Sequence, residues 1–564
     1  MDFEVVIVGS GFGGSVMAYR LAKAGYKVCV LERGKSYPPG SFPRSPLAMQ
    51  NNFWDPSKGL QGLYNVWSFR GSEALVASGL GGGSLIYANV LLRKDTAWFT
   101  EADLIGRDEL DFHYDNVEAM LKPQKYPMDF SPYNKTPKTL ALKFAAEELM
   151  KQNPQNIEWM LPNLAVMFAA DQNQKPALAE PLLPDSHNIH KLQRYTCRLC
   201  GECDIGCNYG SKNTLDHTYL SEAVRLGAEI RTRCEVRSFR PGDEAGYVID
   251  YVVHEPENEG REFDTAKLPS KTITSDKLVL AAGTLGTTYL LLKNRKAFNG
   301  RLSKTLGTRY CGNGDLLTFV MKSKITADGK KIPRVINANY GPVITSAIRG
   351  ADITEGGSGP GFYIQDAGFP EFLNWVIQSV DLGNSLKRYA RFLSRYICGV
   401  LGLNTDSDLS AEIAEVFTAS KYSYASLPLL GMGLDSPDGN MKLDAKEKYL
   451  DVDWNKRGSN PLFKQLTKTS RKIADILQAK FQENPLMYLS RTITVHPLGG
   501  CPMGINPAMG VVNSFGEVFN CPGLYIADGS VMPGPVGANP SLTIAALADR
   551  FAAELIRKES KTDD

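Results

Sequence analysis

The sequence lacks any apolar run that approaches the ~20 residues needed to span a bilayer. Its first residues, MDFE, show no basic stretch followed by an apolar core and a small-residue cleavage site. We therefore expect a cytoplasmic protein without a signal peptide. In that reducing compartment cysteines rarely form structural disulfides.

No charge of one sign dominates the 564 residues, because the chain contains 63 Lys and Arg and 61 Asp and Glu. A nucleic-acid partner usually requires a concentrated basic surface, so we do not expect one. Hydrophobic residues make up 43% and charged residues 22%, which is ordinary for a globular protein.

Glycine is abundant, and its first cluster has a recognisable context. A strand expected over residues 5–8 leads into Gly9, Gly11 and Gly14, and a helix is expected from 15 to 24. This G-x-G-x-x-G spacing after a strand and before a helix is typical of a dinucleotide site, in which the helix N-terminus faces the pyrophosphate. The alternative is a glycine-rich turn without a ligand.

A second buried strand, expected over 27–31, ends at Glu32. A carboxylate there can accept hydrogen bonds from both ribose hydroxyls and would repel a 2′-phosphate, which disfavours NADP. Other candidate cofactor contacts lie in a second glycine loop and at the ends of later expected strands: Gly81, Gly82, Gly83, Ser84, Asn89, Val236, Gly283, Asp528 and Gly529.

Five motifs occur in the order found in one enzyme family: the opening glycine cluster, residues 79–89, AAGTLG at 281–286, HPLGGC at 496–501, and 528–540. The chain thereby resembles the glucose-methanol-choline (GMC) oxidoreductases, and within them the cholesterol oxidase-like branch. The resemblance implies an α/β, Rossmann-like domain that binds FAD, and the oxidation of alcohols to carbonyls. No histidine near residues 79–90 is available for a covalent flavin link.

The nucleotide-binding pattern appears at the start, middle and end of the chain, so we expect one domain assembled from separated segments. The FAD-binding domain is predicted to comprise residues 1–95, 190–315 and 490–564. A mixed α+β substrate-binding domain would comprise 96–189 and 316–489.

The sequence contains only six histidines, and the resemblance places His496 at the flavin N5 edge, with Asn539 beside it. A histidine can hold the substrate's hydroxyl proton near neutral pH, while an amide can only orient the substrate. The alternative for His496 is a hydrogen-bonded structural role. Gln365 stands where the cholesterol oxidases carry a carboxylate for steroid isomerisation, which puts that activity in doubt. Asp366 is a weak candidate to replace it.

Four of the ten cysteines, Cys197, Cys200, Cys203 and Cys207, follow C-x2-C-x2-C-x3-C spacing. That is the spacing of bacterial ferredoxin segments, although Asn208 replaces the usual proline. The spacing predicts a [4Fe–4S] cluster; zinc, disulfides and a metal-free reduced turn are the alternatives. A cluster near FAD would favour a redox protein or quinone over O₂ as the electron acceptor.

Residues 372–403 combine apolar and basic positions at helical spacing. Such a helix could contact a membrane surface peripherally, or it could simply pack on the substrate domain. The predicted function is FAD-dependent oxidation of a hydrophobic alcohol, such as a sterol or a long-chain alcohol, with O₂ or a redox partner as acceptor. The alternative is a non-redox flavoprotein, a decarboxylase or isomerase, that acts on a lipid.

Overall fold

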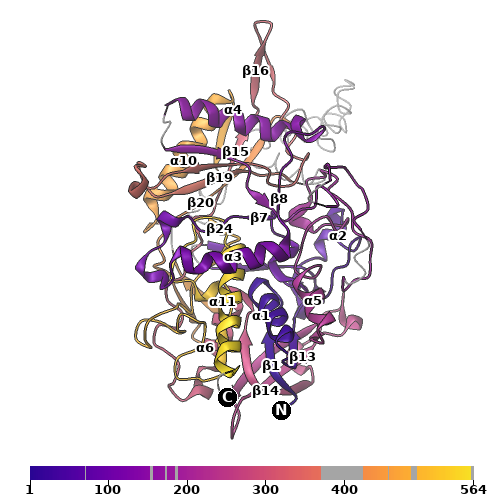
Figure 1. Ribbon diagram of the computed structural model, residues 1–564, viewed down its shortest axis with the longest axis vertical. Helices are drawn as coiled ribbons and strands as arrows, with labels where there is room; N and C mark the ends of the chain where they lie inside the picture. The colour runs from indigo at the N-terminus through magenta and orange to yellow at the C-terminus, as the bar shows by residue number, and fades with distance from the viewer. Residues whose placement is uncertain are drawn as a thin grey trace, which may run out of the picture.

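The computed structural model describes residues 1–560, apart from 70–71, 153–155, 172–173, 184–187, 370–423, 455–456 and 484–491. Two large sheets form its two halves, one in the lower and one in the upper part of Figure 1. The N- and C-termini lie close together at the lower end (Figure 1).

The lower half is built on a seven-stranded sheet with the order β11-β2-β1-β14-β13-β12, in which β25 also pairs with β14. The strands β1, β2, β11, β25 and the end of β14 run parallel, while β12 and β13 are antiparallel. These strands are β1 (Phe3–Val8), β2 (Val28–Leu31), β11 (Glu229–Arg231), β12 (Cys234–Pro241), β13 (Tyr247–Val253), β14 (Ser270–Leu280) and β25 (Leu524–Ile526).

The first helix packs on this sheet through an apolar side. Val16, Leu21 and Ala22 of the first helix are buried, as expected from their spacing. The final helix packs beside it, and both lie next to the central strands in Figure 1. The helices of this half are α1 (Phe12–Lys23), α2 (Pro46–Gln50), α3 (Arg107–Leu121), α5 (Tyr219–Arg225), α6 (Gly283–Asn294) and α11 (Ser541–Ser560).

The upper half is a six-stranded sheet with the order β23-β15-β20-β19-β18-β9, and all of its pairings are antiparallel. Two helices, α4 (Pro137–Gln152) and α10 (Asn460–Ile476), pack on each other and on this sheet. The strands are β9 (Ile157–Met160), β15 (Leu316–Met321), β18 (Ala347–Gly350), β19 (Phe362–Asp366), β20 (Leu427–Gly433) and β23 (Lys480–Glu483).

Short strands form the remaining small sheets. One exposed hairpin, β16 (Lys324–Ala327) and β17 (Lys330–Pro333), projects from the upper end of the molecule (Figure 1). The others are β3 (Trp54–Asp55), β4 (Leu60–Gln61), β5 (Tyr64–Ser68), β6 (Ser72–Ala77), β7 (Val90–Leu91), β8 (Gln124–Lys125), β10 (Asn163–Leu164), β21 (Asn440–Leu443), β22 (Leu450–Asp453) and β24 (Thr492–Thr494).

The fold class is confirmed: a Rossmann-like α/β half assembled from separated segments is joined to a mixed α+β half. All strands of the first sheet fall in the segments predicted for FAD binding, and all strands of the second fall in those predicted for substrate binding. Segment 96–189 is shared, because α3 packs on α11 of the lower half while α4 and β9 join the upper sheet.

The sequence over residues 229–236 predicts one continuous strand, and this prediction is wrong, because the structure has two strands, β11 and β12. The chain turns at Arg233, which has a φ of 59°, so that β11 pairs with β2 while β12 pairs with β13. Among the described helices, none combines the length and the apolar character that a membrane span requires. The amphipathic segment expected over 372–403 lies outside the described residues.

Candidate active site and cofactor cradle

The glycines of the first turn divide into those that pack and one that faces open space. A Cβ at Gly9 would lie 2.3 Å from the Ala281 carbonyl oxygen, and one at Gly14 would lie 2.1 Å from the Gly9 carbonyl oxygen. A Cβ at Gly11 would meet nothing within 4 Å. The turn and the helix–strand contact thus require glycine at 9 and 14, while Gly11 leaves room for a phosphate before the uncapped N-terminus of α1.

The second glycine loop packs directly on the first. Gly81 donates its N–H to Ser10 Oγ at 3.0 Å, and a Cβ at Gly82 would lie 2.7 Å from the Gly11 Cα. A Cβ at Gly83 would meet nothing within 4 Å. The two loops therefore form one cradle with open space at positions 11 and 83.

The side chains of Ser84 and Asn89 differ in whether the described chain supplies their hydrogen-bond partners. Ser84 Oγ donates to the Gly81 carbonyl and accepts from the Leu215 N–H, so it holds the loop. The fully buried amide of Asn89 has no hydrogen-bond partner on either atom within the described chain. A buried amide without hydrogen-bond partners destabilises a folded protein. We therefore expect a bound cofactor to supply the partners of the Asn89 amide.

The Glu32 carboxylate accepts hydrogen bonds from residues beside the first glycine turn. Its Oε2 accepts from the Ser10 N–H at 3.0 Å and from Ser10 Oγ at 2.6 Å, and its Oε1 accepts from the Gly34 N–H at 2.8 Å. A carboxylate offers about four acceptor sites, so Glu32 retains capacity for a ribose hydroxyl on Oε1.

Asp528 joins the end of β25 to the start of α6. Its four hydrogen bonds come from Ser530 N–H and Oγ, Gly283 N–H and Thr287 Oγ1. Burial raises the pKa of this carboxyl. Its oxygens are occupied by protein donors, so we expect Asp528 to shape the neighbouring Gly529 backbone rather than to bind a cofactor through its carboxylate.

Val236 lies on β12, where it pairs with Tyr251 next to a bulge, and it is buried. A backbone contact to a cofactor from this position stays a prediction.

His496 is paired with an aspartate that the sequence did not reveal. Its Nδ1 lies 2.8 Å from Asp315 Oδ1, and Asp315 Oδ2 accepts from the His496 and Val495 N–H groups and from Thr494 Oγ1. A carboxylate that accepts all these bonds favours the proton on Nδ1. The Nε2 atom of His496 is then the nitrogen that can accept a proton.

Asn539 is paired with Gln365, whose Nε2 donates to Asn539 Oδ1 at 2.7 Å. The same short segment that carries Asp315 also holds this loop. Asn313 Oδ1 accepts from the Val536 and Gly537 N–H groups, and its Nδ2 donates to the Ala538 carbonyl. Residues 313–315 therefore hold the His496 side chain through Asp315 and the backbone of the loop before Asn539 through Asn313.

Asp366 follows Gln365 on β19, and adjacent strand residues face opposite ways. Asp366 accepts from Thr345 and Ser346 N–H groups and lies 3.8 Å from the buried Lys138 Nζ on α4. Asp366 is thus directed away from Asn539 and is engaged by structural partners.

Asp435 is a further buried carboxyl beside this site. Its Oδ2 accepts from the Gly312 N–H at 3.0 Å, and its Oδ1 has no hydrogen-bond partner in the described chain. Burial raises the pKa of Asp435 to about 7, with Asp315 nearby adding repulsion. Asp435 had no sequence signal, because only the fold brings it next to residue 312.

The four cysteines of the 197–207 segment line one pocket together with Lys212. All nine described cysteines are free thiols, so no disulfide closes this segment. The Leu199 N–H lies 3.4 Å from Cys197 Sγ, and the Ser211 N–H lies 3.3 Å from Cys207 Sγ. Burial raises the pKa of the Cys197, Cys200 and Cys203 thiols.

Two family models match separate parts of this chain. The family model described as GMC oxidoreductase matches residues 435–548, and that of an NAD(P)-binding Rossmann-like domain matches residues 7–40. A cholesterol oxidase of Mycobacterium tuberculosis is 28% identical over 582 residues, which cover 100% of this chain and 92% of that protein.

These matches support the GMC oxidoreductases as the family of this chain, with similarity to the cholesterol oxidases. The chain is an FAD-dependent alcohol oxidoreductase. A long-chain-alcohol oxidase of Arabidopsis thaliana is 23% identical, with 100% of this chain and 68% of that protein covered. Pyridoxine 4-oxidase from Mesorbium loti shares the fold, with a TM-score of 0.55, 16% identity, and coverage of 98% and 99% of the two chains.

The cradle fits the FAD of GMC oxidoreductases on two structural observations: the open space at Gly11 and Gly83, and the unsatisfied amide of Asn89. Gly9, Gly14, Gly82 and Ser84 would shape this cradle rather than touch the ligand.

Replacing Glu32 with alanine should weaken FAD binding about tenfold or more, because three hydrogen bonds to a charged acceptor are lost beneath the pyrophosphate turn. FAD affinity would be measured by fluorescence titration of the deflavinated protein. Glu229→Ala, on the exposed edge strand β11, is the matched control. Unchanged affinity in Glu32→Ala would remove Glu32 from the cofactor site.

The raised pKa of Asp435 predicts a pH-dependent stability. A carboxyl whose folded pKa lies near 7 binds more protons when folded than when unfolded. Stability should therefore fall as the pH rises from about 4 to about 7, by at most about 1.4 kcal/mol per pH unit for this group. Asp435→Asn should flatten that part of the curve, measured as the free energy of unfolding against pH. An unchanged slope would contradict the assignment.

Proposed function

We propose that this enzyme oxidises the CH–OH group of a hydrophobic alcohol of the sterol or long-chain class. The observation that carries the proposal is the His496–Asp315 pair, whose short segment also holds the loop before Asn539 through Asn313. Bound FAD supplies the hydride acceptor at flavin N5.

His496 would take the hydroxyl proton on Nε2 while hydride leaves the carbinol carbon, so that a carbonyl forms. Asp315 keeps the Nδ1 proton in place and balances the imidazolium charge that develops. Asn539 and Gln365 would orient the substrate oxygen through their amide N–H groups.

The preference for an apolar alcohol rests on two lines of support. Apolar side chains surround the loop before Asn539: a Cβ at Gly537 would lie 2.6 Å from the Trp98 ring and 2.9 Å from Leu434 Cδ2. The relatives that match this chain over its whole length include cholesterol oxidases and a long-chain-alcohol oxidase.

Anaerobic mixing with a panel of alcohols tests this proposal. Cholesterol and a long-chain primary alcohol should bleach the flavin absorption, whereas short polar alcohols should not. If no alcohol reduces the flavin, the non-redox alternative, a lipid decarboxylase or isomerase, gains ground. The steroid product should keep its original double-bond position, because Gln365 cannot act as a carboxylate base and Asp366 faces α4.

We also propose that the four cysteines hold an iron–sulfur cluster. Sulfur ligands of one tetrahedral zinc ion lie about 3.8 Å apart, given Zn–S bonds of about 2.3 Å. Among the described residues, only His190, Asp216 and His217 place three ligand atoms within 4.8 Å of one another, so no three cysteine sulfurs are that close. A cluster does not require its sulfur ligands to meet around one ion, because its thiolates bind at separate corners.

Two further contacts support a cluster at this position. Backbone N–H groups point at the sulfurs of Cys197 and Cys207. Hydrogen bonds to the ligand sulfurs adjust the reduction potential of iron–sulfur clusters in proteins. Lys212 Nζ bonds the carbonyls of Leu85, Tyr87 and Cys203, so it links the cysteine segment to the second glycine loop. A cluster there would take electrons one at a time from the cofactor site.

The electron acceptor would then be a redox protein or a quinone, with O₂ as the acceptor if no cluster is present. The cytoplasmic location and a peripheral membrane contact through residues 372–403 stay predictions.

A further inference from the structure

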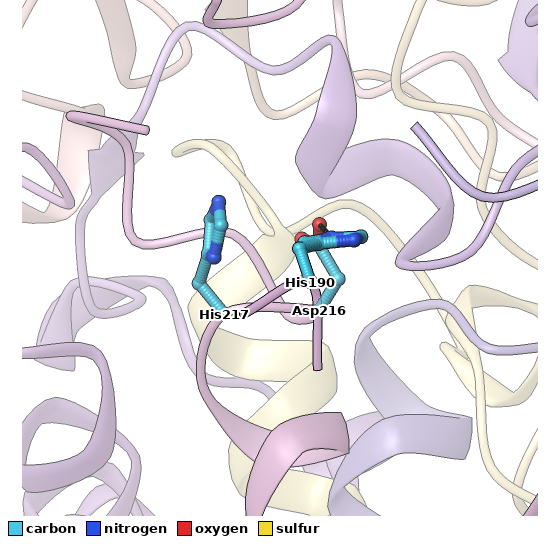
Figure 2. Close-up of side chains that lie close together, drawn as sticks. All are labelled: His190, Asp216 and His217. Atoms are coloured by element: carbon cyan, nitrogen blue, oxygen red, sulfur yellow. Dashed lines mark hydrogen bonds and ion pairs between the residues drawn. The ribbon is translucent and has the colours of Figure 1, made fainter. Parts of the chain in front are cut away.

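A second group of ligand-type side chains lies beside the second glycine loop. His190, Asp216 and His217 place a nitrogen or oxygen atom each within 4.8 Å of one another, and Figure 2 shows the three side chains lying together. Within the described chain this is the only such trio of His, Cys, Asp or Glu residues. It is separate from the 197–207 cysteines, which contribute no atom to it.

Asp216 and His217 are buried and His190 is partly buried, and not all of their polar atoms have a hydrogen-bond partner. His190 Nε2 lies 2.6 Å from Asp216 Oδ2, but Asp216 Oδ1 and His217 Nδ1 have no hydrogen-bond partner among the described residues. Asp216 is 1% exposed and His217 is 7% exposed. A buried polar atom left unpaired destabilises the folded chain, so the group has unused capacity to bind a cation.

The side-chain types suit a metal ligand set. Metal ions bind neutral imidazole and ionised carboxylate, which are the groups that this trio supplies.

The backbone holds the ligands in place without a metal. The Ile189 N–H donates to Ser221 Oγ at 2.9 Å, and Ser221 Oγ donates to the Asp216 carbonyl. The Leu215 N–H donates to Ser84 Oγ at 3.0 Å, which ties the group to the glycine loop. The ligands therefore come from two segments that the fold already brings together.

We propose that His190, Asp216 and His217 bind one divalent transition-metal ion of the zinc class. Two imidazoles and one carboxylate form a borderline ligand set that suits zinc, with a water molecule completing a tetrahedron. Calcium and magnesium prefer oxygen ligands alone. The ion would join the turn at 188–190 to the start of α5 and so stiffen the support of the second glycine loop.

Metal analysis of the purified flavoprotein tests the proposal. The wild type should carry about one zinc, or another divalent first-row ion, per chain after passage over a weak chelating resin. His217→Ala should lose that ion while keeping FAD. Cys200→Ser should retain it, which separates this site from the cysteine segment.

His254→Ala is the matched control, because His254 is also buried, lies 2.7 Å from Glu235 through Nε2 and has an unpartnered Nδ1 in the described chain. It has no second histidine beside Glu235 in a ligand trio, so its loss should leave the metal content unchanged.

A second measurement on the wild type avoids dependence on a variant that folds poorly. After removal of the metal with a strong chelator, added Zn²⁺ should raise the melting temperature and bind with a stoichiometry near one by calorimetry. The proposal is overturned if the chelated protein binds no Zn²⁺ at micromolar concentration, or if His217→Ala binds it as well as the wild type.

Discussion

His496→Ala should slow the reduction of bound flavin by alcohol about 10²–10⁴-fold, because a positioned acid–base group is removed from the reacting hydroxyl. The side chain is fixed from its Nδ1 side by Asp315 at 2.8 Å, so its loss removes the proton acceptor without disturbing the cofactor cradle. Stopped-flow absorbance under anaerobic conditions measures the rate. Flavin content and melting temperature serve as the check that the variant is folded.

Three comparisons separate a catalytic role from a structural one. Exogenous imidazole should partly restore the rate of His496→Ala but not that of Asn539→Ala, whose defect is misorientation of the substrate. Asp315→Asn keeps the histidine but removes the negative charge that balances the developing imidazolium, so its rate should fall and imidazole should not restore it. If His496→Ala reduces flavin at the wild-type rate, His496 is not the base.

The parts of this fold that could be predicted are those that short, local sequence patterns determine. A strand, a glycine turn and a helix follow one another within residues 3–23, and both periodicity and turn chemistry are local there. The cysteine spacing is equally local. The order of five motifs along the chain sufficed to indicate the family.

The parts that could not be predicted depend on long-range packing. Asp315 lies 181 positions from His496 in sequence, and backbone pairings such as that of Cys311 with Leu498 bring their segments together. The break between β11 and β12 occurs at Arg233, a residue type that gives no signal for a positive φ. Asp216 and His190 are likewise joined only by the fold.

The same distinction explains why Gln365 and Asp366 could not be separated in advance. Because the two residues are adjacent on β19, their side chains point to opposite faces of the sheet. The sequence does not show which face lies toward the cofactor half. The contact between Gln365 and Asn539 decides it, and it depends on how the two sheets meet.

Cys200→Ser should abolish iron and acid-labile sulfide in the anaerobically purified enzyme while leaving FAD bound. Cys200 lines the pocket shared by all four cysteines, and a serine oxygen is a poor substitute for a thiolate in such a cluster. Iron, sulfide and flavin would be measured on the same sample. Cys521→Ser, a buried cysteine near the other end of the chain, is the matched control and should keep all three.

The kinetic consequence distinguishes the electron acceptors. In Cys200→Ser, reduction of the flavin by alcohol should persist, because His496 and Asn539 are untouched. Electron transfer to a one-electron acceptor such as ferricenium should fall at least about tenfold, because the cluster's one-electron route from the flavin is lost. If the wild type contains flavin but neither iron nor sulfide, the cysteine segment is a reduced turn, and the enzyme would pass both electrons to O₂.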